Sequence, residues 1–369
     1  MRLRSKLSGG LAPLSASDDL LGDLLRRVSR SFYLSLAILP RPLREPLGLA
    51  YLLARAADTV ADTRLIARAE RIGHLRTLRR AYAGDAADVA AVARAAAPRQ
   101  AEAAERTLLE RVEDVLARVT RLPEGDRAGV RGVLATLTDG MLFDLDRFPG
   151  ESAAGLAALD TLEELDRYTY LVAGCVGEFW TDLHVAHRRR LAGWDPRAMR
   201  ATGARFGKAL QMTNVLRDVP GDLAHGRCYL PARELAALGL TPAALLDPAG
   251  AGRARPLLDR LLGVALEHYD AAWRYTLAIP RREWRMRLAC AWPLLIGQAT
   301  LEALAAHPAP LAASPPVKVE RAAVRVILAR STLTVWSNRA LAAEAARRRA
   351  RIVARIENPP CAARAPRAP

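Results

Sequence analysis

The sequence predicts an all-α protein whose body is one large domain. Apolar residues recur at three- and four-residue spacing through almost all of residues 18–345, which is the period of an amphipathic helix. Stretches that alternate between apolar and polar residues, as strands do, are nearly absent. No shift in composition and no repeat of fixed period marks a second domain. We therefore expect a basic N-terminal segment (1–17), a helical domain (18–345) and an Arg/Ala/Pro-rich tail (346–369).

The helical pattern divides at clusters of Pro, Gly, Asp and Ser. These clusters lie at residues 40–42, 84–98, 148–152, 194–196 and 247–248, and each is typical of a turn or loop. Between them the periodic segments are, in order, 20–36, 43–57, 108–122, 130–145, 161–185, 199–219, 257–277, 286–306 and 320–335. We expect a helix in each.

Composition excludes several classes of protein. The chain has 369 residues, 51% of them hydrophobic and 25% charged, so it is too apolar to be disordered. Its longest weakly charged run, 288–307, is interrupted by Pro293, Gln298 and Glu302, and we expect no transmembrane helix and no signal peptide. The four cysteines are far apart, which favours neither a disulfide framework nor a zinc site. A cytoplasmic protein is the expectation.

The chain is strongly basic, with a formal net charge of +16 that is concentrated toward its two ends. Such a balance favours anionic ligands such as diphosphates, or peripheral contact with an anionic membrane on its inner face. It also raises the alternative of a nucleic-acid-binding protein. The arginine run 347–351 has no interleaved aromatic residues, so we expect no nucleic acid as a partner.

Two pairs of aspartates carry the chemistry of the sequence. Asp58 and Asp62 end one apolar helical segment, and Asp218 and Asp222 end another. A spacing of four sets both carboxylates of a pair on one helix face, with their Cβ atoms about 5–6 Å apart. Arg55 precedes the first pair by one turn. A solvated polar face or a salt-bridged network is the alternative interpretation.

Carboxylates paired on two helices are typical ligands of Mg²⁺, which completes its coordination with water and substrate phosphate oxygens. Arg55, and Arg217 with Asn214 before the second pair, add groups suited to gripping a diphosphate. The residues alone therefore predict an Mg²⁺-dependent enzyme acting on a phosphorylated substrate such as an allylic diphosphate.

Several segments, taken in order, resemble the motifs of the squalene/phytoene synthase family. They are SRSF (29–32), YLLARAADTVAD (51–62), YTYLVAGCVG (168–177) and LQMTNVLRDVPGDLAHGRCYLP (210–231). Two later segments, RLACAWPLLIGQATLEAL (287–304) and PVKVERAAV (316–324), resemble the C-terminal part of squalene synthases more than that of phytoene synthases. The resemblance covers roughly residues 24–335.

The resemblance implies a fold and a reaction. The fold is the isoprenoid synthase type, a helical domain around a central cavity. The reaction is Mg²⁺-dependent head-to-head condensation of two farnesyl diphosphates to presqualene diphosphate, followed by NADPH-dependent reduction to squalene. A sister reaction without reductant, giving phytoene, dehydrosqualene or presqualene diphosphate, is the alternative within the family. We expect a monomer.

The resemblance also implies roles for individual residues. It assigns the metal to Asp58, Asp62, Asp218 and Asp222, acid/base catalysis to Tyr168, substrate binding to Arg30, Arg55, Tyr51, Gln211, Asn214 and Arg217, and NADPH to Lys318, Arg321, Arg55 and Arg217. A non-catalytic family member that serves as an assembly subunit is a further alternative, against which the intact acidic pairs argue.

The chain departs from the family pattern at a few positions. Ala61 stands where an acidic residue is common, and Glu320 stands where squalene synthases have a basic one. Pro220 and Gly221 lie inside the second acidic motif, so we expect a kinked or ended helix there and Asp222 on a distorted turn.

Overall fold

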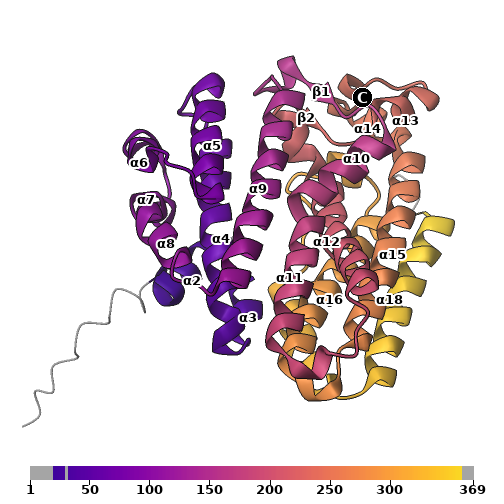
Figure 1. Cartoon of the computed structure of the whole chain (residues 1–369). Coiled ribbons are helices and arrows are strands. Elements are labelled where there is room, and N and C mark those ends of the chain that lie inside the picture. Colours follow the sequence, from indigo (N-terminus) through magenta and orange to yellow (C-terminus); the bar gives the residue numbers. More distant parts are fainter. Residues whose placement is uncertain (1–19, 30–31, 360–369) are drawn as a thin grey trace, which may run out of the picture.

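The computed structural model describes residues 20–29 and 32–359. The predicted basic segment 1–17, the end of the tail and the candidate substrate-binding residue Arg30 lie outside the described residues. The all-α prediction is confirmed, because helices account for nearly all of the regular structure (Figure 1).

Seven helices form the body, and further helices flank and connect them. The helices of the body are α4 (Arg41–Asp62), α9 (Glu124–Arg147), α11 (Cys175–His187), α12 (Pro196–Ala224), α15 (Arg255–Ala278), α16 (Trp284–Ala306) and α18 (Asn338–Glu357). The other described α-helices are α2 (Leu25–Ser29), α3 (Phe32–Ala37), α5 (Arg68–Ala83), α6 (Val89–Ala96), α7 (Ala103–Glu110), α8 (Val112–Val119), α10 (Leu162–Thr169), α13 (Ala232–Ala237), α14 (Pro248–Arg253) and α17 (Arg321–Thr334). Two π-helical segments (Leu20–Leu24 and Tyr170–Gly174) and six 3₁₀ turns (Ala97–Arg99, Ala153–Gly155, Arg189–Leu191, Pro242–Leu246, Arg281–Glu283 and Pro310–Ala312) complete the set.

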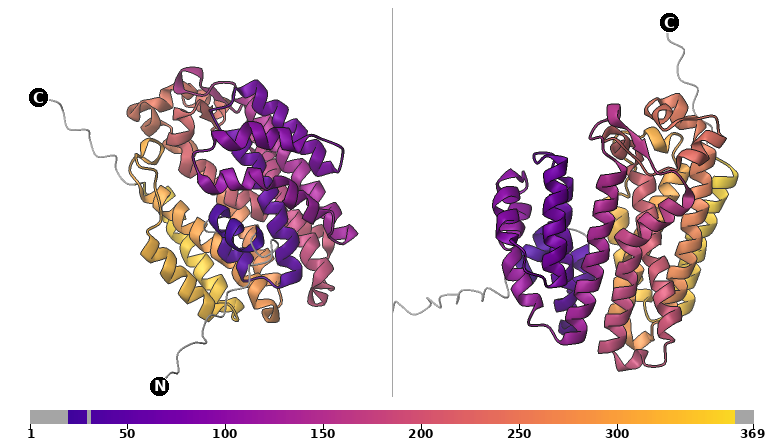
Figure 2. Two further views of the ribbon diagram at one scale, coloured as in Figure 1. Left: turned by 90° about the vertical axis from the view of Figure 1, so that its left-hand side faces the viewer. Right: turned by 45° about the horizontal axis from the view of Figure 1, so that its top comes forward.

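The helices of the body lie side by side across the molecule. Contacts run from α4 to α9, from α9 to α11, from α11 to α12 and from α12 to α15 (Figure 1). The remaining N-terminal helices flank α4 on one side, and α16, α17 and α18 close the other side, where the last helix is yellow (Figure 2). The middle helices α4, α9, α11 and α12 therefore have neighbours on both sides.

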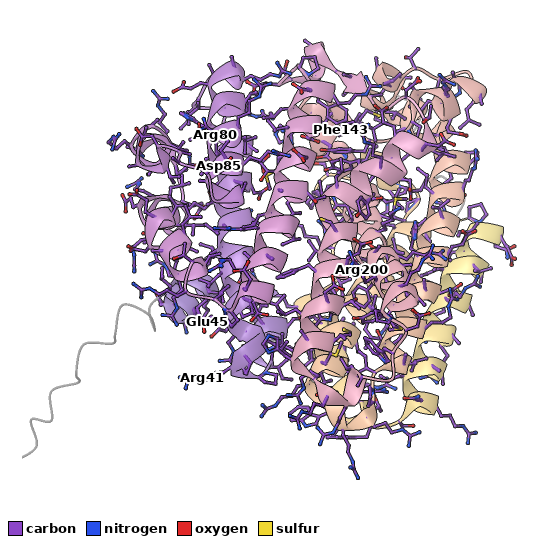
Figure 3. All side chains as sticks on the ribbon, viewed as in Figure 1. Arg41, Glu45, Arg80, Asp85, Phe143 and Arg200 are labelled. Carbon is purple, nitrogen blue, oxygen red and sulfur yellow. The ribbon has the colours of Figure 1, made fainter. Side chains whose placement is uncertain are left out.

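Burial of apolar faces holds this arrangement together. One apolar cluster joins the N-terminal helices to α9 and α11, and a second joins α12, α15, α16 and α18. Helix α16 is long and apolar enough to cross a membrane, but 67% of its most apolar window is buried inside the molecule, as in a core helix. Nitrogen-tipped side chains are spread around the outline of the body (Figure 3).

The structure differs from the predicted elements in three segments. The predicted helix 108–122 is divided at Arg111 into α7 and α8. The predicted break at 84–98 contains α6, which Asp88 caps by accepting a hydrogen bond from the Ala91 amide. Helix α18 crosses the predicted domain boundary at residue 345, because Leu341, Ala345 and Ile352 bury one of its faces.

The segment 161–185 is continuous, as predicted, but not uniformly α-helical. A π-helical turn, Tyr170–Gly174, separates α10 from α11 and packs against α9 and α12. Such turns widen a helix by one residue per turn and re-aim the side chains that follow. This turn supplies wall residues of the cavity described below.

Two short strands fix the loops at one end of the bundle. β1 (Ala157–Ala158) pairs in parallel with β2 (Arg227–Cys228). The chain reaches β2 through Gly226, whose φ of 79° is left-handed and which leaves no room for a side chain beside the Gly150 and Ser152 carbonyls. The pairing sets Arg227 beside the ends of α4 and α9.

Candidate active site

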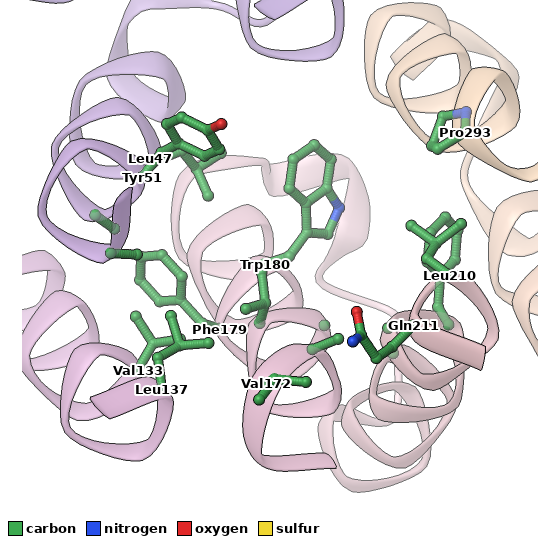
Figure 4. Close-up of a pocket in the computed structure, with 18 of the residues that line it drawn as sticks. Leu47, Tyr51, Val133, Leu137, Val172, Phe179, Trp180, Leu210, Gln211 and Pro293 are labelled. Carbon is green, nitrogen blue, oxygen red and sulfur yellow. The ribbon is translucent and has the colours of Figure 1, made fainter. Parts of the chain in front are cut away.

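A cavity of about 450 Å³ lies among the central helices. Its walls come from α4, α9, the π-helical turn, α11, α12, α15 and α16. Most of the lining is apolar, and Figure 4 shows Leu47, Val133, Leu137, Phe179 and Leu210 around it. Such a chamber suits a long hydrocarbon chain and excludes water from it.

Polar side chains line the cavity from two facing helices. Tyr51, Arg55 and Asp58 come from α4, and Gln211 and Asn214 come from α12. The Asn214 side-chain amide donates a hydrogen bond to Gln211 Oε1 at 3.3 Å. The structure thus brings together five of the sequence-predicted site residues at one cavity.

The first acidic motif lies on the last turns of α4. Arg55 donates a hydrogen bond to Asp58 at 2.6 Å and also pairs with Glu105 of α7, which sequence reasoning had not singled out. Burial and the neighbouring Asp62 raise the pKa of Asp58 to about 7, although Arg55 acts in the opposite direction. Asp62 is therefore close enough to Asp58 to favour the protonated form of its carboxyl group.

The second acidic motif lies near the end of α12. Arg217 donates two hydrogen bonds to Asp218, at 2.8 and 2.5 Å. Burial and the proximity of Asp218 raise the pKa of Asp222 to about 7, and Asp62 contributes to this shift. The two motifs therefore lie close enough to influence each other.

Pro220 does not end the helix, contrary to one of the expected outcomes. Helix α12 continues to Ala224 with Pro220 inside it. Proline has no backbone N–H, so Pro220 removes one hydrogen bond of the helix backbone, and the helix continues for one more turn before it ends. Asp222 accordingly projects from a helix one turn after Asp218.

Arg227 joins the two motifs, and the sequence analysis had missed it. It lies 3.5 Å from Asp62 and 3.4 Å from Asp144 of α9. Asp144 is buried and accepts a hydrogen bond from the Tyr229 hydroxyl at 2.5 Å. Burial raises the pKa of Asp144, while Arg227 and Tyr229 act to lower it. Asp144 is one of four aspartates on α9, so no local signal in the sequence singled it out.

Tyr168 belongs to this buried cluster and is not among the described residues that line the cavity. Its ring stacks on Tyr229 with 4.7 Å between centroids. Burial and nearby Asp144 raise the pKa of the Tyr168 hydroxyl far above its usual range, with Asp222 adding to the effect. The group is therefore held protonated beside the acidic motifs.

Glycines let two cavity walls approach closely. A Cβ atom at Gly177 of α11 would lie 1.8 Å from the Gly203 carbonyl oxygen of α12, and one at Gly207 would lie 2.0 Å from that of Ala173. No side chain fits in either position.

The donor set suits Mg²⁺ shared with a substrate. Burial, together with repulsion from neighbouring carboxylates, raises the pKa values of Asp58 on α4 and Asp222 on α12, and bound cations would relieve the repulsion. Within the part of the chain that the structure describes, no three His, Cys, Asp or Glu side chains are gathered into a preformed metal centre. Mg²⁺ is often held by one or two carboxylates plus phosphate oxygens, which fits this arrangement.

The structure separates the four residues assigned to NADPH by resemblance. Arg55 lines the cavity, and Arg217 lies at the second acidic motif beside Asp218. Lys318 and Arg321 are not among the described residues of the lining; Lys318 precedes α17 and Arg321 begins it.

Comparisons with known proteins identify relatives of this chain. The family model described as squalene/phytoene synthase matches residues 25–323. The chain is 28% identical over 300 residues to squalene synthase of Eremothecium gossypii, covering 78% of this chain and 64% of that protein. It is 31% identical over 262 residues to presqualene diphosphate synthase of Rhodopseudomonas palustris, covering 68% of this chain and 76% of that protein.

Solved structures share the fold. A TcSQS complex with the ligand BPH1237 superposes with a TM-score of 0.69 at 23% identity, covering 92% of this chain and 97% of that one. A dehydrosqualene synthase in complex with ligand gives a TM-score of 0.58 at 21% identity, covering 86% and 95%. Together with the family match over most of the sequence, this leads to one conclusion: the chain belongs to the squalene/phytoene synthase family, whose members are prenyltransferases.

Proposed function

We propose that this protein condenses two molecules of farnesyl diphosphate head to head to presqualene diphosphate. The observation that carries the proposal is an apolar cavity lined by Asp58 of the first acidic motif and by Gln211 and Asn214 of α12. The second motif lies nearby, because Asp62 contributes to the raised pKa of Asp222. The prenyl chains would occupy the apolar part, and the diphosphates would lie at the aspartates. The names of the two curated relatives described above support the same substrate class.

The chain's own residues divide the work. Asp58, Asp62, Asp218 and Asp222 would hold Mg²⁺, which when bound neutralises the diphosphate leaving group. Arg55 and Arg217 would bind diphosphate oxygens, together with Arg30. Tyr51, Gln211 and Asn214 would orient the substrates. Tyr168, protonated and close to Asp222, would hold or move a proton during cyclopropane closure.

A second step, reduction to squalene with NADPH, is the finer part of the proposal. It rests on the resemblance of residues 287–304 and 316–324 to squalene synthases, with Lys318 and Arg321 on the cofactor phosphates. The alternative is a synthase that needs no reductant and stops at presqualene diphosphate or makes dehydrosqualene or phytoene.

Product analysis tests the proposal. The purified chain, expected to be a monomer, is incubated with farnesyl diphosphate and Mg²⁺, with and without NADPH, and products are identified by mass spectrometry. Presqualene diphosphate in both tubes supports the condensation, and squalene only with NADPH supports the reduction. Products formed only from geranylgeranyl diphosphate would contradict the substrate assignment.

Variants connect the products to the site. Asp58→Asn and Asp218→Asn should each lower turnover at saturating Mg²⁺ by about a hundredfold or more, because each removes a negative charge from the metal-diphosphate site. Wild-type turnover in either variant would contradict the two-motif site. Lys318→Ala should leave presqualene diphosphate formation intact and raise the NADPH concentration needed for squalene.

A further inference from the structure

Helix α17 carries an apolar stripe on its outer face. Ala322, Val326, Ala329 and Leu333 follow one another at spacings of four, three and four residues, and all are exposed. Trp336 continues the stripe just beyond the helix. At 100° per residue these five positions fall within about 80° of the helix circumference. Val326, Leu333 and Trp336 are 54%, 80% and 50% exposed.

The stripe is not the face by which α17 joins the protein. Ile327 and Ser331 are buried on the opposite face, where the Trp292 indole of α16 donates a hydrogen bond to Ser331 at 3.1 Å. Among the described residues, the other large apolar side chains with this degree of exposure are Leu34, Leu65 and Leu246, each on a different part of the chain. Three such side chains gathered on one helix form a patch of the kind that marks an interaction site.

Arginines border the stripe on both sides. Arg321 and Arg325 lie along one edge, Arg330 lies along the other, and all three are exposed. No acidic residue occurs from residue 321 to residue 343. The border therefore carries three positive charges along the helix, and the acids nearest to it are Glu320 at the start of α17 and Glu344 of α18, whose pKa Arg330 helps to lower.

An aromatic and basic corner adjoins the Trp336 end of the stripe. The Trp284 and Trp336 rings lie 5.7 Å apart, and the Arg285 guanidinium lies 5.2 Å from the Trp284 ring centre. Arg281 and Arg282 are exposed in the preceding turn. The corner is thus an amphipathic aromatic pair surrounded by positive charge.

Acidic groups do not cancel this charge, and the corner is held rigidly. Glu283, the acid within the turn, is buried and paired with Arg188 and Arg190. The buried Arg287 donates hydrogen bonds to the Val335 carbonyl at 2.9 Å and to the Asn338 side chain at 2.7 Å, which fixes the backbone on both sides of Trp336. The surface is therefore preformed.

We propose that α17 and the Trp284–Trp336 corner dock the protein on an anionic lipid bilayer, with the apolar stripe at the headgroup–acyl boundary. An apolar stripe edged by arginines and ending in tryptophans has the composition of a helix that lies in a membrane interface. Anionic lipid headgroups supply the negative charges that would pair with the arginines of the border. A protein partner would have to supply a matching groove with acidic walls on both sides, whereas a bilayer needs no such fit.

The docking helix is one layer away from the cavity. Trp292, which holds Ser331 of α17, is followed by Pro293, which lines the cavity. If the proposed function holds, this wall separates a lipid-like product from the bilayer by a single helix. Binding to vesicles needs no substrate, so a failure of the proposed function would leave the docking test intact.

Vesicle sedimentation of the full chain tests the proposal. The vesicles contain phosphatidylcholine alone, or phosphatidylcholine and phosphatidylglycerol in equal parts. We expect binding to the anionic vesicles that weakens with salt, and weak binding to the neutral ones. The triple variant Val326→Ser, Leu333→Ser, Trp336→Ser should reduce the partition constant by about tenfold or more, since three apolar contacts are lost.

Matched variants control for hydrophobicity and charge. Leu65→Ser with Leu246→Ser removes exposed apolar side chains elsewhere and should leave binding unchanged. Arg321→Gln, Arg325→Gln, Arg330→Gln should weaken anionic-vesicle binding more than the equally charged change Arg26→Gln, Arg94→Gln, Arg233→Gln. Leu333→Asp gives a single-site version that keeps the core intact, because Leu333 is 80% exposed.

Several outcomes would overturn the proposal. Wild-type protein that binds neither vesicle would do so, as would stripe variants that bind as well as the wild type. Binding abolished by removing residues 1–19, with the stripe intact, would transfer the contact to the N-terminal segment. A dimer in sedimentation velocity that Leu333→Asp dissociates would identify the stripe as a contact between two copies of the chain.

Discussion

Asp144 shows how a residue outside the cavity can govern its acidic end. It accepts the Tyr229 hydrogen bond and balances the charge of Arg227, which in turn contacts Asp62. Tyr229 stacks on Tyr168. We therefore regard Asp144 as a positioning residue for both an arginine and a tyrosine at the site.

Asp144→Asn should lower kcat by about tenfold to a hundredfold, because small misplacements of reacting groups are costly. Asparagine keeps an acceptor for Tyr229 but removes the charge opposite Arg227. Steady-state kinetics of the condensation measures the effect, with Asp146→Asn as control, since Asp146 is 65% exposed on the same helix. In a double-variant cycle with Tyr229→Phe, the two losses should not add. Additive losses would show that Asp144 acts independently of Tyr229.

The raised pKa values of Asp58 and Asp222 predict a pH dependence of Mg²⁺ binding. Both carboxyls have a pKa of about 7 and must lose their protons to bind the metal, so Mg²⁺ affinity should rise between pH 6 and pH 8. Without Mg²⁺, the stability of the folded protein should change with pH in the opposite direction and fall as the pH rises. A carboxyl whose pKa is higher in the folded state binds protons more tightly there, so its contribution to stability is lost as the pH rises through 7.

Thermal unfolding with and without Mg²⁺ checks both statements. The melting temperature without metal should fall from pH 6 to pH 8, and the increase caused by Mg²⁺ should grow over the same range. Asp222→Asn should flatten both trends, because the amide does not titrate. A metal-induced increase that is independent of pH in the wild type would mean that these two carboxylates are not ligands.

At the scale of elements, the contact between α11 and α12 depends on glycine. Gly177→Ala would force a methyl group against the Gly203 carbonyl and should lower stability by ~2–3 kcal/mol, because backbone atoms have to move apart. Gly132→Ala on α9 is the matched control, since nothing lies within 4 Å of its added Cβ and alanine favours a helix. Denaturant unfolding measures both. Equal stability of the two variants would contradict the close packing.

Helix periodicity in the sequence predicted most of the helices, but it did not reveal where a helix is interrupted or changes from α to π. Asp58 and Asp62 could be expected on one face because their spacing alone fixes it. The interruption at Arg111 and the π-helical turn Tyr170–Gly174 leave the apolar pattern continuous, so the pattern could not reveal them. Asp144 and Arg227 come together through the β1–β2 pairing of loops far apart in the chain, which no local signal encodes.

At the scale of the whole molecule, α18 packs against α15 and α16, and we propose that it belongs to the domain and not to a tail. Ending the chain at residue 345 would remove the fully buried Ile352 and the pairing of Arg349 with Asp270. We expect a loss of at least ~2 kcal/mol, the value of burying one large aliphatic side chain. Ending the chain at residue 359 is the control and should leave the unfolding midpoint unchanged. An equally stable 1–345 protein would restore the boundary that composition predicts.

The arginine-rich composition explains why the sequence predicts a domain boundary at residue 345. Residues 347–351 contain four arginines, which suggests a solvated tail. Arg347, Arg349 and Arg351 do project into solvent, with 54%, 46% and 62% of their side chains exposed. Arg348 instead lies on the same face as Leu341, Ala345 and Ile352, where it is 14% exposed and pairs with Glu302 and Glu344. Long basic side chains can cover a helix that has few apolar residues, so composition alone underestimates how much of it is buried.

The arginines at the two acidic motifs have a consequence for the order of events during binding. Arg55 holds Asp58 and Arg217 holds Asp218, so each motif carries its own internal counterion. A cation that takes the carboxylate frees the guanidinium, and a diphosphate that takes the guanidinium frees the carboxylate. In the proposed reaction each ligand would thus lower the cost of admitting the other, and the site would fill by exchange of partners, with metal and diphosphate entering as one cooperative unit.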